Sequence, residues 1–231
     1  MILRNILFYL LLIPTTIFFA LTSMLTLFTS RKISYWYITR WSHLLIFYAK
    51  ICCGLQYKVT GVTNLPKIAT IVLSNHQSTW DAIFMQVLLP PQCWILKREL
   101  LQIPFFGWGL ALLQPIAINR QAFNAIKILI TQAGMRLQQG RWIVLFPEGT
   151  RVPYAKNKRF ARGGAKLAIA TNTAIIPIAH NAGKFWPRGL WITQSGIIEV
   201  VIGKPINPQN NSADELTKQV EIWINNTKNS L

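Results

Sequence analysis

The feature that most constrains this chain is an uncharged apolar segment at its start. No residue between Arg4 and Arg31 carries a charge, and the run exceeds the roughly 20 apolar residues that a helix needs to span a bilayer. It is longer than the apolar core of a signal peptide, and no convincing small-residue cleavage site follows it. Pro14 can kink such a helix without ending it. We therefore expect a retained membrane anchor that either crosses the bilayer or enters one leaflet.

The next segment, residues 33–57, is amphipathic. Arg40, His43, Phe47 and Lys50 recur at helical spacing along a mostly polar stripe, and the remaining positions are apolar or aromatic. This pattern predicts a helix at the membrane interface. The alternative is a helix that packs on the core of the following domain.

Charge indicates both a partner and an orientation. The chain has 24 Lys and Arg against 7 Asp and Glu, a formal net charge of +17, which indicates nucleic acid, a membrane surface or a phosphorylated substrate as partner. Arg31, Lys32 and Arg40 follow the apolar segment closely, so if that segment spans the bilayer, the positive-inside tendency puts the rest of the chain on the cytoplasmic side. The cysteines fit neither a disulfide framework nor a metal-ligand spacing, so we interpret them as core or membrane-facing thiols: Cys52, Cys53 and Cys93.

The remainder of the chain alternates strand and helix patterns. Apolar or β-branched runs predict strands at 69–73, 114–118, 142–146, 174–180 and 197–203, and helical periodicity predicts helices at 81–89, 121–139, 164–171 and from about 213 onward. Pro177 indicates an edge or irregular position in its strand. We therefore expect residues 1–58 to form membrane-anchoring helices. Residues 59–231 should form an α/β domain with a mixed, largely parallel sheet flanked by helices.

The first candidate site is "NHQSTWD", between a predicted strand and a predicted helix. On one continuous helix, His76 and Asp81 would point roughly 140° apart. If Ser78 is the N-cap, however, Asp81 is the third helical residue, and the His76 ring can fold back over the first turn. Asp81 would then accept a hydrogen bond from one ring nitrogen and leave the other as a general base. The alternative is a loop histidine and a capping acid.

The second candidate site is "LFPEGTR", which directly follows a predicted buried strand. Ligands of open α/β sheets bind beyond the carboxyl ends of the strands. Gly149 allows close approach to the backbone, Arg151 can bind a phosphate bidentately, and Glu148 beside it suggests an orienting hydrogen bond. The alternative is a strand-ending turn with a surface ion pair.

Three further stretches carry basic residues or a histidine. Residues 97–110 combine Lys97 with glycines and aromatics, which suits the wall of an acyl-chain pocket; the alternative is a core segment with exposed basic residues. Arg120 follows a predicted strand in "AINR". We interpret His180 as structural, because no acid lies near it in the sequence.

Taken in order, "NHQSTWD", "AINR", "FPEGTR" and "IIPIAH" resemble the motifs of the phospholipid and glycerol acyltransferases, most closely the bacterial 1-acylglycerol-3-phosphate acyltransferases. The resemblance covers roughly residues 60–205. One departure is Asn119, where an acidic or aromatic residue commonly precedes the arginine. The resemblance implies transfer of a fatty acyl group from an acyl thioester to the free hydroxyl of 1-acylglycerol-3-phosphate, giving phosphatidate. It implies no metal and no cofactor, with acyl-CoA or acyl carrier protein as co-substrate.

The resemblance also implies a role for each candidate residue. His76 would remove the hydroxyl proton, Asp81 would hold its ring, and backbone N–H groups at the helix start would be candidates for binding the oxyanion. Lys97 and Arg151 would bind phosphate, assisted by Arg120. The implied acceptor-binding set is Lys97, Arg120, Glu148, Gly149, Thr150 and Arg151.

The expected partners are an acyl thioester donor, a lysophospholipid acceptor, an anionic membrane surface and, as a donor carrier, acyl carrier protein, but no nucleic acid. The expected location is the bacterial inner membrane, with the active site facing the cytoplasm. Other acceptors stay open: glycerol-3-phosphate, another lysophospholipid or a lyso-ornithine lipid. A hydrolase with Ser78 as nucleophile lacks a G-x-S-x-G elbow. A non-catalytic binder of anionic lipid or nucleic acid would leave the His76–Asp81 pair unexplained.

Overall fold

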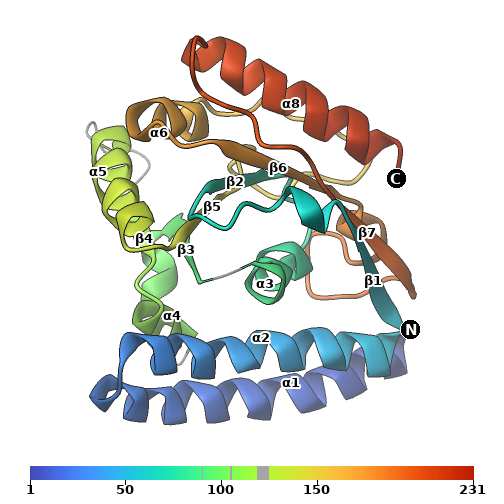
Figure 1. Ribbon diagram of the computed structural model, residues 1–231. Helices are drawn as coiled ribbons and strands as arrows, with labels where there is room; N and C mark the ends of the chain where they lie inside the picture. Colours follow the sequence, from blue (N-terminus) through green and yellow to red (C-terminus); the bar gives the residue numbers. More distant parts are fainter. Residues whose placement is uncertain (90, 105, 119–124) are drawn as a thin grey trace.

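The chain forms a helical hairpin that packs beneath a mixed sheet with helices on both faces (Figure 1). The structure is a computed structural model that describes residues 1–231 except 90, 105 and 119–124. The helices are α1 (Ile2–Ser23), α2 (Arg31–Cys53), α3 (Thr79–Leu88), α4 (Phe106–Leu112), α5 (Ala125–Gln138), α6 (Gly163–Thr171), α7 (Ala182–Phe185) and α8 (Ala213–Asn229). Short 3₁₀ turns are η1 (Met24–Phe28), η2 (Val62–Asn64) and η3 (Arg98–Gln102).

Within the described residues, seven strands form one sheet in the order β1-β7-β6-β2-β5-β3-β4. The strands are β1 (Leu55–Thr60), β2 (Ile71–Ser74), β3 (Gln92–Lys97), β4 (Ile116–Ile118), β5 (Trp142–Leu145), β6 (Ile175–His180) and β7 (Gly196–Ile202). β6 and β7 are antiparallel, and every other neighbouring pair is parallel. The predicted fold class is therefore confirmed. Each predicted strand and helix has a counterpart, although residues 121–124 of the 121–139 helix lie outside the described residues.

Pro177 does not lie at an edge of the sheet, so that part of the prediction is wrong. Its strand, β6, lies between β7 and β2. The ladder with β7 begins only at Ile178, and the N–H of Gly203 donates to the Pro177 carbonyl at 2.9 Å. The N–H and C=O of one strand residue point to the same side, so the side on which Pro177 lacks an N–H is the side of β7. At this position β7 has already ended, and no ladder hydrogen bond is lost. The expected irregular position explains why the proline is tolerated.

Successive side chains of the buried strands point to opposite faces of the sheet, so a separate core forms on each face. Ile71 and Leu73 of β2 pack into the core covered by α5, α6 and α8. Val72, between them, packs into the opposite core with α2 and α3. All three side chains are at most 2 % exposed, as expected for a strand buried on both faces.

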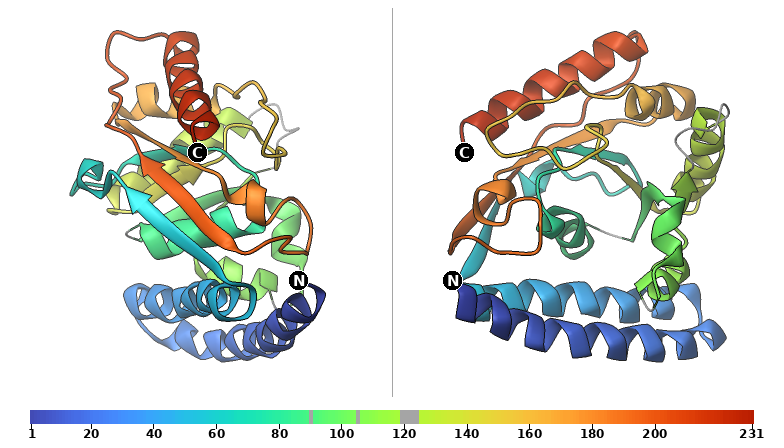
Figure 2. Two further views of the ribbon diagram at one scale, coloured as in Figure 1. Left: turned by 90° about the vertical axis from the view of Figure 1, so that its right-hand side faces the viewer. Right: turned by 180° about the vertical axis from the view of Figure 1, so that it is seen from behind.

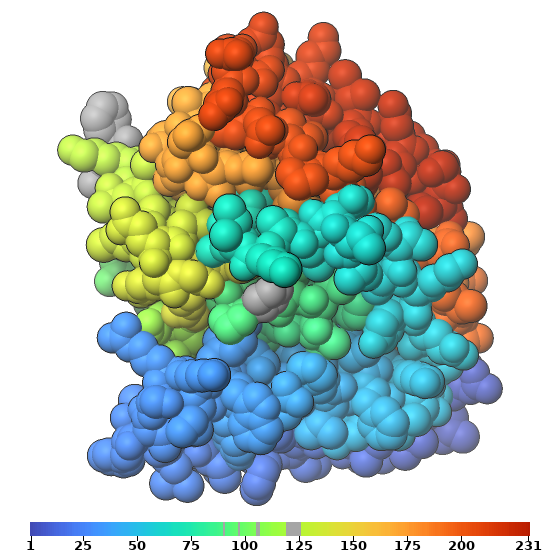
Figure 3. Space-filling model, viewed as in Figure 1, coloured from blue at the N-terminus to red at the C-terminus, as the bar shows by residue number. Residues whose placement is uncertain are grey.

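The N-terminal hairpin lies along one end of the molecule (Figures 1 and 3). The segment Ile2–Phe28 has a mean hydropathy of 2.0, is long and apolar enough to cross a membrane, and is only 17 % buried in its most apolar window. Pro14 lies within α1 without ending it. An apolar helix with so little protein cover suggests association with a membrane.

α2 packs between α1 and the α/β part of the chain (Figure 2). Leu45 and Ala49 of α2 are buried in the core with α3, and the Ser42 hydroxyl donates to Gln86 of α3 at 2.5 Å. The packing alternative for this segment is therefore the one observed. Trp36 and Phe47 nevertheless stay more than half exposed, at 57 % and 52 %.

Polar contacts fix α1 to the loop between α7 and β7. The Asn5 side chain is 1 % exposed; it donates to the Ile192 carbonyl and accepts from the Ile192 N–H, each at 2.9 Å. The Tyr9 hydroxyl donates to the Leu190 carbonyl, and Phe8 meets Trp186 edge to face. The expected domain boundary at residue 58 falls inside β1, and the division into 1–58 and 59–231 stays a prediction.

We predict that Asn5→Ala destabilises the protein by about 2 kcal/mol, because it leaves both backbone groups of Ile192 buried without partners. Thermal unfolding of the detergent-solubilised protein measures the effect. Asn226→Ala is the matched control, since it makes the same change at an exposed helical position and should not lower the midpoint. Equal midpoints for the two variants would contradict the assigned role of Asn5.

Candidate active site

The candidate residues gather at the carboxyl edge of the parallel strands. His76 follows β2, Glu148 follows β5 and His180 ends β6, and these strands are neighbours in the sheet. This is the edge at which open α/β sheets bind ligands. Lys97 is the last residue of β3, but its side chain is outside the described part of the structure. Arg120 also lies outside the described residues.

His76 and Asp81 form the expected pair. Ser78 is the N-cap of α3 and Asp81 its third residue, and the two form a capping box. The His76 Nδ1 lies 2.9 Å from Asp81 Oδ1. Asp81 Oδ2 accepts from the N–H groups of Gln77 and Ser78, both at 2.8 Å. The predicted fold of the ring over the first helical turn is therefore confirmed.

The environment of Asp81 keeps it ionised. Burial of this fully buried carboxylate would raise its pKa, but the His76 ring, the nearby His180 and the Gln77 N–H together hold the pKa below its usual value. An ionised Asp81 requires the proton of neutral His76 to be on Nδ1, which leaves Nε2 as a base. The His76 ring stacks on Phe146 with a centroid distance of 4.2 Å and stays 17 % exposed, so a ligand can reach it.

The helix-start donors and Ser78 are already occupied. The N–H groups of Gln77 and Ser78 bind Asp81, and the Trp80 N–H binds Ser78 Oγ at 3.0 Å. These three donors are therefore not available for an oxyanion. Because Ser78 is fully buried and its hydroxyl caps α3, it is not placed to act as a hydrolase nucleophile.

His180 is a buried neutral imidazole beneath the pair. Its Nδ1 accepts from the Ala182 N–H at 3.3 Å, so its Nε2–H donates to the Asn75 carbonyl at 2.9 Å. Burial lowers the pKa of His180. Its Nε2 lies 3.7 Å from Asp81 Oδ2. The acid missing near His180 in the sequence is thus supplied by α3, the helix that follows the neighbouring strand β2, and only the strand order could have revealed it.

The segment after β5 holds the backbone of His76 from the other side. Glu148 Oε2 accepts from the His76 N–H at 3.2 Å, and the Val152 N–H donates to the His76 carbonyl at 2.7 Å. Gly149 has a φ of +70°, which this turn requires and which favours glycine. Arg151 therefore lies one residue from a direct contact with His76. Glu148 is 3 % exposed, which excludes the surface ion pair considered above.

Glu148 is an acid of the site whose pKa is raised. Burial raises its pKa to about 7, against the opposing effects of the His76 N–H and of the positive charges of Lys228 and Lys158. Lys228 comes from α8, and sequence reasoning did not identify it. Among the described residues, no group of three or more His, Cys, Asp or Glu side chains could hold a metal ion.

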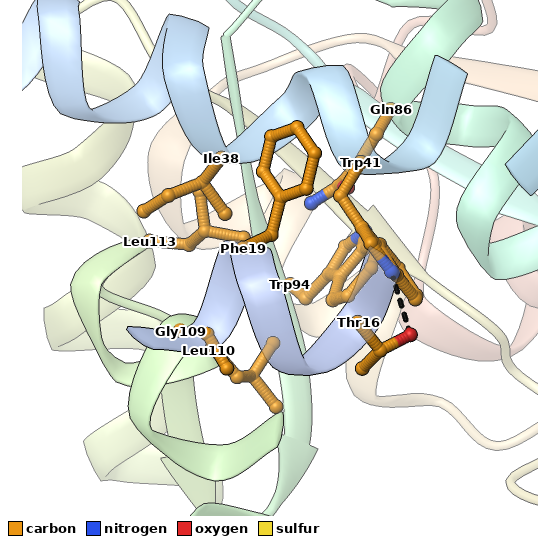
Figure 4. A pocket seen from close by; sticks show the side chains of 10 residues that line it. Thr16, Phe19, Ile38, Trp41, Gln86, Trp94, Gly109, Leu110 and Leu113 are labelled. Atoms are coloured by element: carbon orange, nitrogen blue, oxygen red, sulfur yellow. Dashed lines mark hydrogen bonds between the residues drawn. The ribbon is translucent and has the colours of Figure 1, made fainter. Parts of the chain in front are cut away.

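An apolar pocket lies between the N-terminal hairpin and the β3–α4 region (Figure 4). Trp41 at its wall donates to Thr16 Oγ1 at 3.0 Å. Gly109 and Leu110, from the stretch predicted to wall an acyl-chain pocket, are part of its lining. The lining residues are Thr16, Phe19, Ala20, Ile38, Trp41, Gln86, Trp94, Gly109, Leu110 and Leu113.

Comparisons with known proteins agree with the motifs. The model of the Acyltransferase family matches residues 56–181. The chain is 38 % identical to the 1-acyl-sn-glycerol-3-phosphate acyltransferase of Pseudomonas aeruginosa, over 97 % of this chain and 90 % of the relative. It is 32 % identical to the protein of the same name from Borreliella burgdorferi, over 62 % and 58 % of the two chains.

A solved structure has the same fold. The crystal structure of the 1-acyl-sn-glycerophosphate (LPA) acyltransferase PlsC from Thermotoga maritima matches with a TM-score of 0.83 and 23 % identity, over 99 % of this chain and 95 % of that one. That likeness concerns the fold alone, whereas the family model and the Pseudomonas relative establish descent. The chain belongs to the acyltransferase family.

Proposed function

We propose that this protein transfers a fatty acyl group from an acyl thioester to the free hydroxyl of 1-acylglycerol-3-phosphate, giving phosphatidate. The observation that carries the proposal is the 2.9 Å contact between His76 Nδ1 and Asp81 Oδ1 at the carboxyl edge of the sheet. The names of the relatives support the choice of acceptor.

In the proposed reaction, His76 Nε2 removes the proton of the acceptor hydroxyl as its oxygen attacks the thioester carbonyl. A C–O bond forms, and collapse of the tetrahedral intermediate breaks the C–S bond. The imidazolium then returns the proton to the leaving thiolate. Asp81 stays ionised, holds the ring and stabilises the imidazolium. Glu148 acts on the backbone of His76, not on its ring.

The acceptor phosphate is proposed to bind Arg151, with Lys97 and Arg120 as further cations and Gly149 and Thr150 shaping the site. The assignment of Arg151 as a phosphate ligand is supported by its position next to Val152, whose N–H donates to the His76 carbonyl at 2.7 Å. A phosphate bound there would hold the acceptor close to His76 Nε2, and a guanidinium suits bidentate binding of phosphate.

The apolar pocket is proposed to hold an acyl chain. Gln86 at its wall belongs to α3 and follows Asp81 by five residues, or about 8 Å along the helix axis. One short helix therefore connects the pocket wall to the His76–Asp81 pair. The exposed apolar face of α1 would place the pocket within reach of membrane lipid.

We further propose that the protein lies in the bacterial inner membrane with its site facing the cytoplasm. The net charge of +17 favours an anionic membrane surface. Acyl-CoA and acyl carrier protein are both donors compatible with the proposal.

We predict that His76→Ala abolishes phosphatidate formation from labelled lysophosphatidate and acyl-CoA. Asp81→Asn should lower kcat roughly 10³-fold or more, because an amide cannot hold the productive tautomer. Assays of the purified protein in mixed micelles measure both effects. His43→Ala, on α2, is the matched control and should keep wild-type activity. Activity that survives in the His76 variant would contradict the mechanism.

We predict that Gly109→Leu shortens the preferred acyl chain. A Cβ at Gly109 would meet only Ser23 Oγ, at 3.8 Å, so the larger side chain fills pocket space without displacing backbone. If the leucine keeps about two methylenes of a long acyl chain out of the pocket, the loss is roughly 1.6 kcal/mol. The kcat/KM for long chains, divided by the kcat/KM for short chains, should then fall roughly tenfold. Donor and acceptor chain lengths are varied in turn. An unchanged ratio in both series would exclude an acyl chain from this pocket.

We predict that Glu148→Gln removes a pH dependence of stability. The pKa of about 7 in the fold lies above the ordinary value of 4.5 for a glutamate, so the folded state binds the extra proton between these pH values. The wild type should therefore lose stability relative to the variant as pH rises through this window, by about 3 kcal/mol in total. Denaturant unfolding of both proteins at several pH values measures the difference. A constant difference would show that Glu148 has an ordinary pKa.

A further inference from the structure

The loop formed by residues 147–161 carries the proposed acceptor-binding residues and closes on itself. The Ala161 N–H donates to the Pro147 carbonyl at 2.9 Å, so the two ends of the loop meet. Its first part contains Glu148 and Arg151, next to His76. Its tip, at Lys156 and Asn157, is exposed.

The tip of this loop is held from below by Lys228 of α8. The Lys228 Nζ donates to the Lys156 carbonyl at 2.9 Å and also to Asn157 Oδ1. Although it is a lysine, Lys228 is only 1 % exposed. A buried ammonium is costly unless it is paired or hydrogen-bonded, and here the loop supplies those partners.

The position of Lys228 in the sequence makes this burial unexpected. Leu216, Val220 and Ile224 recur every four residues along α8, are fully buried and belong to one apolar core. Lys228 continues the same spacing, where the pattern predicts another apolar residue. The lysine therefore interrupts an apolar stripe at the point where α8 reaches the 147–161 loop.

Lys228 also acts electrostatically on the site. Its positive charge opposes the rise in the pKa of Glu148 that burial causes. Burial lowers the pKa of Lys228, and Glu148 counteracts that effect. The other charged groups acting on Glu148 are Asp81, which raises its pKa, and Lys158, which lowers it.

We propose that Lys228 is a positioning residue for acyl transfer, which fixes the tip of the 147–161 loop so that Glu148 and Arg151 stay in place beside His76. This inference rests on the proposed function. Lys228 lies outside residues 56–181, the part of the chain that the family model matches, and it touches no reacting atom. Its effect passes through the loop.

The test compares Lys228→Met with two controls in the full-length, detergent-solubilised protein. Methionine keeps the packing of the stem and removes the cation. Ile224→Ala weakens the packing of α8 on the same stripe while keeping the Lys228 hydrogen bonds to the loop. Lys218→Met makes the same change as Lys228→Met at an exposed position of α8. Amide hydrogen exchange of residues 147–161 and steady-state kinetics are measured for all three variants.

Lys228→Met should accelerate exchange in the 147–161 loop and lower kcat/KM for lysophosphatidate roughly 10- to 100-fold, mainly through KM. Lys218→Met should do neither, and Ile224→Ala should lower the unfolding midpoint while leaving KM unchanged. In the Lys228→Met background, the pH window in which Glu148→Gln changes stability should move upward. Loop exchange equal to that of Ile224→Ala, or an unchanged KM, would overturn the proposal.

Asn157→Ala tests the same contact from the loop side if Lys228→Met does not fold. It should also raise KM, and the double variant should be no worse than the more severe single variant, because Asn157→Ala removes one of the two loop contacts that Lys228→Met also removes. Full additivity would overturn the proposal. If the wild type forms no phosphatidate, the proposed function fails, whereas the exchange data still decide whether Lys228 orders the loop.

Discussion

The rest of the site depends on the buried carboxylate of Asp81. One of its oxygens binds the His76 ring, and the other accepts two backbone N–H groups of the preceding turn. A buried charge without such partners would cost several kcal/mol. The same group thus begins α3, closes the turn after β2 and orients the imidazole. One carboxylate therefore supports both the start of α3 and the orientation of the imidazole.

Acids are scarce in this chain, and most of them lie where they order the site. Asp81 and Glu148 hold the ring and the backbone of His76. On α8, Asp214 pairs with Arg162 at 2.5 Å, and Glu221 accepts from the Phe160 N–H at the end of the 147–161 loop. In a chain with a net charge of +17, each of these carboxylates neutralises a cation or binds backbone next to the loop. The remaining positive charge agrees with the proposed binding of anionic lipid and phosphate.

Sequence patterns predicted local features well, because their causes are local. Ser78 and Asp81 belong to one helical turn, and the strand β5 is a continuous apolar run. Patterns failed where the cause is distant. β1 is largely exposed and polar, and it is a strand because it pairs with β7, some 140 residues later. Likewise, the contact of His180 with Asp81 follows from the strand order, and the burial of Lys228 follows from the path of a loop 72 residues earlier.

The attachment of the hairpin determines how the site is held relative to a membrane. α2 passes into β1 through Gly54 alone, whose φ is +68° and whose added Cβ would meet Ser195 at 3.1 Å. Asn5 fixes the other helix to the loop before β7 through two buried hydrogen bonds. Neither connection contains a flexible linker. The apolar face of α1 is therefore joined to the sheet by direct packing and short connections. If α1 lies in a membrane as proposed, helix packing would set the depth of His76 relative to lipid. A change in this packing would then alter access of the proposed acceptor without altering the His76–Asp81 pair.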